Sequence, residues 1–140
     1  MTAAPNLKPI YVCGCTASGK SALALALAQQ LDGELISVDS MQVYRGLDIG
    51  TAKPSHEEQQ LVRHHLINVV ELTEPFDAAL FASQADAAVQ DIQARGKVPI
   101  FCGGTGFYFQ AWRGGLSVIP KASAELRAEL EATPLATLLA

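Results

Sequence analysis

The chain carries Gly14-Cys15-Thr16-Ala17-Ser18-Gly19-Lys20-Ser21 near its start, and these residues match the phosphate-binding pattern G-x-x-x-x-G-K-S/T at every fixed position. The apolar residues 10–13 predict a buried strand before this loop, and the Ala- and Leu-rich residues 21–31 predict a helix after it. Such a loop forms an anion site, because its backbone N–H groups and the helix dipole favour negative charge. Lys20 adds a full positive charge, and the Ser21 hydroxyl suits a magnesium ion beside the phosphates.

Apolar runs and helical segments alternate along the rest of the chain. We expect further strands at residues 34–38, 65–70 and 98–102, and helices at 55–62, 77–95, 107–112 and 122–131. Residues 40–54 carry glycines and no regular apolar repeat, so we expect a loop there. The alternation predicts an α/β fold in which a parallel sheet is covered by helices on both faces. Ligands of such folds bind at the carboxyl ends of the strands, where the phosphate loop, Asp39 and Gly103-Gly104-Thr105 should converge.

Composition narrows the class of protein. A chain of 140 residues predicts one domain with its own core, and no apolar run reaches membrane-spanning length although 49% of the residues are hydrophobic. Residues 1–9 lack the apolar segment of a signal peptide. The net charge of −4 is not typical of nucleic-acid-binding domains, which are usually basic. We expect the scattered basic residues on the solvated surface, with a local basic patch as the alternative: Arg45, Lys53, Arg63, Arg113, Lys121 and Arg127.

The three cysteines show no metal-ligand spacing and indicate a reduced, cytosolic protein. Cys13 and Cys102 fall in expected strands, so we expect small buried thiols there. Cys15 lies in the phosphate loop and could instead be reactive, because helix N-termini lower the pKa of a thiol. His64 and His65 are neighbours on an expected strand and face opposite ways, so we expect structural roles for both rather than a shared metal ion.

Asp39 follows the apolar residues 34–38 and has three possible roles. Its carboxylate could hold magnesium through water, as in many phosphate-loop enzymes. It could act as a general base toward a nucleophile that acidifies as its new bond forms. It could also simply cap a helix or turn. The sequence pattern leaves these alternatives open.

Four blocks of the sequence together resemble the tRNA dimethylallyltransferase family, also called tRNA isopentenyltransferases. They are the phosphate loop at 14–21, Ser37-Val38-Asp39-Ser40-Met41-Gln42-Val43-Tyr44-Arg45-Gly46, Asp48-Ile49-Gly50-Thr51-Ala52-Lys53-Pro54, and Gly103-Gly104-Thr105-Gly106-Phe107-Tyr108. The first block occurs in many unrelated proteins, whereas the second and third in tandem are specific to the family. The resemblance runs from about residue 9 to residue 131. Cys15 and Arg63 stand where the family often has Pro, and Asn68 where it often has Asp.

Members of this family are roughly twice as long as this chain. They resemble a phosphate-loop core with a helical insertion that grips the anticodon stem-loop. The resemblance therefore implies that residues 1–118 form the amino-terminal part of the catalytic core and 119–140 the start of a truncated tRNA-binding insertion. It implies a sheet that is incomplete at its carboxyl end. We expect a marginally stable chain, inactive on tRNA by itself, with Leu126 and Leu130 facing water.

The resemblance also implies a reaction and its residues. A dimethylallyl group would pass from dimethylallyl diphosphate to the exocyclic amine of the adenosine 3′ of the tRNA anticodon. Residues 14–21 would bind the diphosphate, Ser21 would hold magnesium, and Asp39, Thr16 and Lys20 would be catalytic, with Asp39 accepting the amine's proton. The implied enzyme is cytoplasmic, has no membrane contact, and is a monomer at full length. The implied tRNA contacts are Asp39, Ser40, Met41, Gln42, Thr105 and Arg127.

Other functions share the same loop. A nucleoside or small-molecule kinase would use it to bind ATP with magnesium, although such an enzyme has no need of the block at residues 39–54. An adenylate prenyltransferase would use a free nucleotide as the acceptor. A non-catalytic fragment would bind diphosphate and show no turnover with any acceptor.

Overall fold

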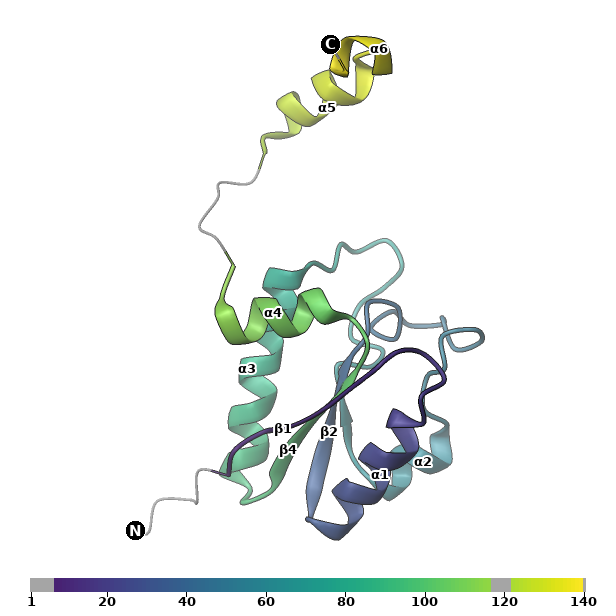
Figure 1. The fold of residues 1–140 in the computed structure, drawn as a ribbon, viewed down its shortest axis with the longest axis vertical. Helices are drawn as coiled ribbons and strands as arrows, with labels where there is room; N and C mark the ends of the chain where they lie inside the picture. Colours follow the sequence, from purple (N-terminus) through teal and green to yellow (C-terminus); the bar gives the residue numbers. More distant parts are fainter. Residues whose placement is uncertain (1–6, 117–121, 140) are drawn as a thin grey trace.

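The computed structural model describes residues 7–116 and 122–139, and its described strands form one parallel sheet in the order β1-β4-β2-β3 (Figure 1). The elements are β1 (Ile10–Cys13), α1 (Lys20–Gln30), β2 (Gly33–Val38), α2 (His56–Leu61), β3 (His64–His65), α3 (Ala78–Ala94), β4 (Val98–Gly103), α4 (Gly106–Gly114), α5 (Ala124–Ala132) and α6 (Leu135–Leu138). The expected α/β fold is therefore confirmed. The expected boundary between residues 118 and 119 lies outside the described residues.

Helices cover both faces of the sheet, and the alternation along β2 shows how. Every residue of β2 is buried. Leu35 packs on one face with Ala24 and Ala28 of α1, whereas Ile36 packs on the other face with Phe81 of α3. Figure 1 shows α1 on one side of the strands and α3 with α4 on the other. The apolar residues Leu35, Ile36 and Val38 made this strand recognisable from the sequence, although Glu34 and Ser37 within it are polar.

Three expectations about the strands need correction. The strand expected at 65–70 is only two residues long, because Leu66 and Asn68 adopt left-handed backbone conformations with φ values of 61° and 54° that no strand accommodates. β1 is only partly buried, because it lies at the edge of the described sheet and pairs only with β4. Val12 is buried, but Tyr11 and Cys13 are exposed. Cys13 on this strand is therefore exposed rather than buried, and Cys102 is half-buried.

The helices follow the expected segments closely. Asp77 precedes α3 and accepts a hydrogen bond from the backbone N–H of Leu80 at 2.8 Å, as an N-cap does. Helix α6 was not expected. Leu126 and Leu130 of α5 are exposed, as expected, and Figure 1 shows α5 and α6 apart from the sheet. Within the described parts of the chain, no helix is both long and apolar enough to cross a membrane.

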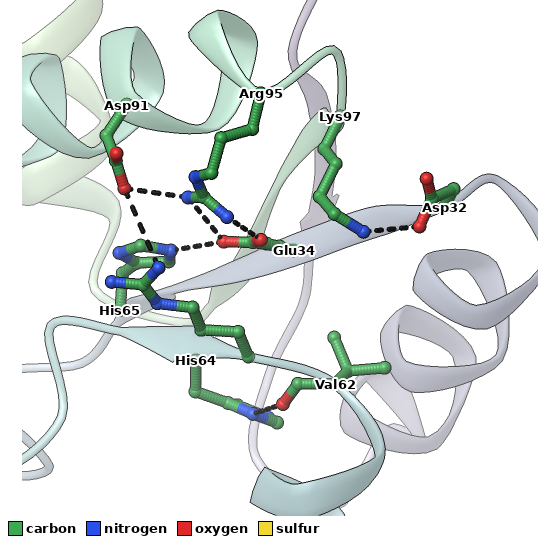
Figure 2. Close-up of polar contacts among 9 residues, drawn as sticks. Asp32, Glu34, Val62, His64, His65, Asp91, Arg95 and Lys97 are labelled. Carbon is green, nitrogen blue, oxygen red and sulfur yellow. Dashed lines mark hydrogen bonds and ion pairs between the residues drawn. The ribbon is translucent and has the colours of Figure 1, made fainter.

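The amino end of β2 is closed by a cluster of charged side chains (Figure 2). Glu34 is 4% exposed and accepts hydrogen bonds from both terminal nitrogens of Arg95 and, at 2.7 Å, from Nε2 of His65. Arg95 also bonds Asp91 at 2.7 Å. Burial alone raises the pKa of Glu34, but the hydrogen bonds and charges of Arg95 and His65 outweigh burial and hold that pKa below its usual value. This cluster gives His65 the structural role expected for it.

Candidate active site

A pocket of about 440 Å³ lies at the opposite, carboxyl end of the sheet. It is lined by residues of the phosphate loop and α1, of β2 and the turn after it, of α2 and the loop before it, and of β3 and β4. These residues are Thr16, Lys20, Ser21, Leu25, Leu35, Ser37, Asp39, Met41, Gln42, Gly50, Thr51, Ala52, Pro54, Glu58, His64, Cys102 and Gly103. The expected convergence on one crevice is thus confirmed for the phosphate loop, Asp39 and Gly103.

The phosphate loop connects β1 to α1 as the sequence predicts. Gly19 immediately precedes α1 and has a φ of 81°, and Ala17 has a φ of 63°. Glycine adopts such a left-handed conformation without the steric cost that a side chain imposes. Lys20 donates a hydrogen bond from Nζ to the backbone oxygen of Cys15 at 3.0 Å. The ammonium group is therefore folded over the loop, where an anion bound to the backbone N–H groups would meet it.

Asp39 follows β2 directly, is half-buried and faces the pocket. Its Oδ1 accepts hydrogen bonds from the backbone N–H groups of Met41 at 2.8 Å and Gln42 at 3.1 Å. Asp39 therefore caps a turn, which is one of the three roles that its place in the sequence suggested. Capping fixes the direction of the carboxylate and leaves it on the pocket wall, so this role is compatible with either of the other two.

Close backbone contacts join the end of β4 and the loop after it to the end of β2 and to the phosphate loop. A Cβ atom at Gly103 would lie 2.1 Å from the backbone oxygen of Val38, so only glycine fits there. Thr105 donates its N–H to the same oxygen at 3.2 Å. A Cβ at Gly104 would lie 3.1 Å from the backbone oxygen of Gly14, which places this loop beside the phosphate loop. Thr105 therefore lies near Asp39, although it does not line the pocket.

The remaining residues expected to contact tRNA fall in different places. Met41 lines the pocket and is 48% exposed, whereas Ser40 is exposed outside it. The side chain of Gln42 is engaged within the protein: its Oε1 accepts from Ser37 Oγ at 2.8 Å, and its Nε2 donates to the backbone oxygens of Thr51 and Ala52. Arg127 lies on α5, which contributes nothing to the pocket.

Several pocket residues were not anticipated from the sequence. Leu35 and Ser37 face the pocket because they share a face of β2 with Asp39, two residues apart each time. His64 joins them because it pairs with Leu35. Its Nδ1 lies 2.7 Å from the backbone oxygen of Val62, and burial lowers its pKa. Leu35 and Ser37 could have been placed in the pocket from the sequence, because residues two apart on a strand share a face with Asp39. His64 could not, because its place depends on the pairing of β3 with β2.

Cys102 also faces this pocket, from the middle strand β4. Burial raises the pKa of its thiol, while the charge of Lys20 and a hydrogen bond with Ser21 act in the opposite direction. The thiol therefore lies beside the hydroxyl that the sequence assigns to magnesium. This proximity again depends on strand order, which the sequence pattern does not specify.

Lys53 corrects a further expectation. It was expected on the solvated surface, yet its side chain is only 3% exposed. Its Nζ donates hydrogen bonds to the backbone oxygen of Tyr44 and to the side-chain oxygens of Asp48 and Asn68. A charge is buried only where partners compensate for its lost hydration, and here three oxygens do so.

The pocket offers oxygen ligands that fit magnesium. Among residues 7–116 and 122–139, no group of three or more His, Cys, Asp or Glu side chains is arranged to hold a metal ion. Magnesium needs no such group, because it keeps several waters and commonly binds through one or two protein oxygens together with substrate phosphates. Ser21 and Asp39 both face the pocket and are the residues suited to this.

Comparisons with known proteins agree with this geometry. A family model described as IPP transferase matches residues 42–139. The chain is 56% identical over 126 residues to a tRNA dimethylallyltransferase of Anaeromyxobacter dehalogenans (strain 2CP-C), covering 90% of this chain and 42% of that protein. It is 54% identical over 123 residues to one of Halorhodospira halophila, covering 88% and 40%.

Two solved structures share the fold. The full-length tRNA isopentenylpyrophosphate transferase of Bacillus halodurans superposes with a TM-score of 0.76 at 44% identity, over 89% of this chain and 42% of that one. A eukaryotic dimethylallyltransferase, solved in the course of acting on tRNA, gives a TM-score of 0.76 at 36% identity, over 91% and 33%. The chain thus spans well under half the length of these relatives.

Proposed function

The chain belongs to the IPP transferase family, and we propose that it forms the donor-binding part of a tRNA dimethylallyltransferase. The reaction transfers a dimethylallyl group from dimethylallyl diphosphate to the exocyclic amine of the adenosine 3′ of the tRNA anticodon. One observation carries the proposal: Lys20, Ser21 and Asp39 line the same pocket. In this proposal Lys20 and the phosphate loop bind the anion and Asp39 accepts the proton, within one pocket.

The phosphate loop accounts for the leaving group. As the carbon–oxygen bond of the donor breaks, its electron pair remains on the diphosphate, whose negative charge grows. Lys20 and the backbone N–H groups at residues 14–21 stabilise that charge as it develops, which lowers the barrier to bond breaking. Thr16 lines the same part of the pocket and contacts the diphosphate in this proposal. Magnesium bound at Ser21 supplies additional positive charge beside the diphosphate.

Asp39 accounts for the proton that the acceptor amine must lose. The amine nitrogen forms a bond to the dimethylallyl carbon, becomes acidic, and loses a proton to the free carboxylate oxygen. The two backbone hydrogen bonds to Oδ1 hold the group in place for this transfer. The target adenosine must leave its stack to reach Asp39, as bases do in enzymes that modify them. In this proposal the RNA is contacted by Ser40, Met41, Gln42, Thr105 and Arg127. Gln42 contacts it through atoms other than its side-chain amide, which is hydrogen-bonded within the protein.

The three free cysteines suit a reducing compartment, and we propose a cytoplasmic enzyme that acts as a monomer at full length. The test is to incubate the protein with magnesium, dimethylallyl diphosphate and an anticodon stem-loop RNA, and to measure the RNA mass and the binding heat in parallel. We expect saturable, magnesium-dependent binding of dimethylallyl diphosphate, and an RNA heavier by one dimethylallyl group wherever transfer occurs. Preferential binding and consumption of ATP would instead identify a kinase, and binding with no transfer would identify a diphosphate-binding fragment.

A further inference from the structure

One wall of the pocket is a loop held in an unusual conformation. We call residues 44–54 the wall loop, because Gly50, Thr51, Ala52 and Pro54 face the pocket from it. Ala52 has a φ of 51°, in the left-handed region that residues other than glycine rarely adopt. Such a conformation persists only where the surrounding contacts impose it, and it is found preferentially at functional sites. The contacts that impose it here therefore matter for the pocket.

Lys53 supplies the contacts behind the wall loop. Its Nζ lies 2.8 Å from the backbone oxygen of Tyr44, 2.8 Å from Asp48 Oδ1 and 2.6 Å from Asn68 Oδ1. An ammonium group has three N–H donors, so each donor has an acceptor. Tyr44 and Asp48 belong to the wall loop, whereas Asn68 comes from the segment after β3. The one ammonium therefore ties the two ends of the loop together and fastens the loop to a separate part of the fold.

Gln42 supplies the contacts on the pocket side. Its Nε2 donates to the backbone oxygens of Thr51 at 3.1 Å and Ala52 at 3.0 Å, and its backbone N–H donates to Asp39 Oδ1. Its backbone oxygen accepts from the N–H of Asn68 at 3.1 Å, which links it to the group that Lys53 binds. The wall loop is thus connected to the turn that orients Asp39, and Lys53 holds the assembly from the side away from the pocket.

We propose that Lys53 is a positioning residue for the donor pocket. This inference rests on the proposed function, because the pocket is taken as the site of the prenyl donor. Lys53 does not line the pocket and does not touch the donor. By fixing the wall loop, it sets the shape of the wall against which the apolar part of the donor packs. The phosphate loop lies on other elements, so the diphosphate group is bound independently of Lys53.

Because Lys53 should affect the wall loop and not the phosphate loop, the test compares the affinities of two ligands that differ in whether they reach the wall loop. Inorganic diphosphate occupies only the phosphate loop, whereas dimethylallyl diphosphate also contacts the wall loop. In the presence of magnesium, Lys53→Met should leave the affinity for inorganic diphosphate nearly unchanged and weaken dimethylallyl diphosphate about tenfold. Amide hydrogen exchange in residues 48–53 should become faster. The matched control is Lys97→Met, because Lys97 pairs with Asp32 at the far end of the sheet and should change neither measurement.

Two variants of Asn68 keep the proposal testable if Lys53→Met does not fold. Asn68→Gly tolerates the φ of 54° but removes the side-chain oxygen, so it should weaken dimethylallyl diphosphate selectively. Asn68→Asp keeps the oxygen and adds a negative charge opposite the ammonium, so it should slow amide exchange in residues 48–53.

An unchanged ratio of the two affinities in Lys53→Met and Asn68→Gly would overturn the proposal. An equal loss of both ligands is one such case, and it is what a purely structural role predicts. If the parent protein binds inorganic diphosphate but not dimethylallyl diphosphate, the proposed function fails, yet hydrogen exchange still decides about Lys53. Faster exchange of the wall loop in Lys53→Met than in Lys97→Met then supports the positioning role, and equal exchange overturns it.

Discussion

The two ends of strand β2 carry carboxylates in opposite situations. Glu34, its second residue, is 4% exposed and is bound by the side chains of Arg95 and His65. Asp39, which follows its last residue, is half-buried, lines the pocket and is bound by backbone N–H groups. The first carboxylate is saturated with charged partners that hold its charge in place. Among the described residues no ion pair is found at the second, whose orientation is set by backbone N–H groups, as the roles proposed for it require.

The same strand therefore carries a charge cluster at one end and, in the proposed function, the reaction at the other. At the amino end, side chains fill the space and close it. At the carboxyl end, glycines and backbone groups bring three segments together and leave a pocket between them. Loops at this end of a parallel sheet are where binding and catalytic residues gather on a rigid scaffold. The comparison predicts that changes at Asp39 and Lys20 alter function, whereas changes around Glu34 alter stability.

The largest effect is expected at Asp39. In an enzyme active on tRNA, Asp39→Asn should reduce prenyl transfer by roughly two to four orders of magnitude, the scale of a positioned proton acceptor. The amide keeps the shape and one acceptor oxygen, so diphosphate binding should be nearly intact. The measurement is single-turnover transfer to an anticodon stem-loop RNA, with calorimetric binding of dimethylallyl diphosphate in parallel. Transfer at the parent rate would exclude Asp39 as the base, and a collapse of binding would favour a role in holding magnesium.

The second effect concerns Lys20 and the donor. Lys20→Ala should weaken magnesium-dependent binding of dimethylallyl diphosphate by about two orders of magnitude, because it removes a charged hydrogen bond to the diphosphate. Lys97→Ala is the matched control, since this lysine pairs with Asp32 at the amino end of the sheet. Isothermal titration decides the matter, and equal heats from Lys20→Ala and the parent would show that the loop does not bind the donor.

The third effect tests the charge cluster around Glu34 at the amino end of β2. Arg95→Met leaves Glu34 buried without its main partner and should lower the free energy of unfolding by roughly 2–3 kcal/mol, at the lower end for a broken buried pair because Arg95 is partly exposed. Arg45→Met breaks the exposed pair with Glu71 and should cost less than about 1 kcal/mol. Chemical denaturation measures both. Equal costs for the two variants would mean that the cluster around Glu34 is no stronger than a surface ion pair.

The smallest effect is on the pH dependence of stability. The pKa of Glu34 is lowered in the folded protein, so the unfolded chain binds more protons as the pH falls. The contribution of Glu34 should be fully present above the ordinary glutamate pKa of about 4.3 and should be lost as the pH falls through the lower pKa of the folded state. Glu34→Gln should therefore flatten the acid limb of a plot of unfolding free energy against pH. An unaltered acid limb would contradict the assignment.

The sequence predicted the parts of the fold that depend on local pattern. The phosphate loop, the buried strand β2 and the cap of α3 at Asp77 each have a short-range signal, and all three are confirmed. The extent of β3 was wrong because Leu66 and Asn68 take left-handed conformations. Asn favours that region and so offered a signal, whereas Leu offers none. The exposure of Cys13 was wrong because it depends on the place of β1 in the sheet.

The site could be predicted in outline only. The convergence of the phosphate loop, Asp39 and Gly103 follows from the rule for parallel sheets. His64 and Cys102 could not be placed, since each enters the pocket through a strand pairing that joins distant segments. The burial of Lys53 could not be foreseen either, because its acceptors come from two separate segments. The catalytic, diphosphate-binding, magnesium-binding and tRNA-binding roles assigned to individual residues, those of Asp39 and Lys20 included, all stay predictions.

The contact between Gly103 and Val38 has a consequence for how this protein tolerates change over evolutionary time. The spacing between Asp39 and the phosphate loop is set by backbone atoms at Val38, Gly103 and Gly104. Replacement of side chains that take no part in these backbone contacts should leave that spacing unchanged, which gives such positions freedom to vary. A single methyl group at position 103 has no such freedom, because it would meet an oxygen 2.1 Å away and force β2 and β4 apart.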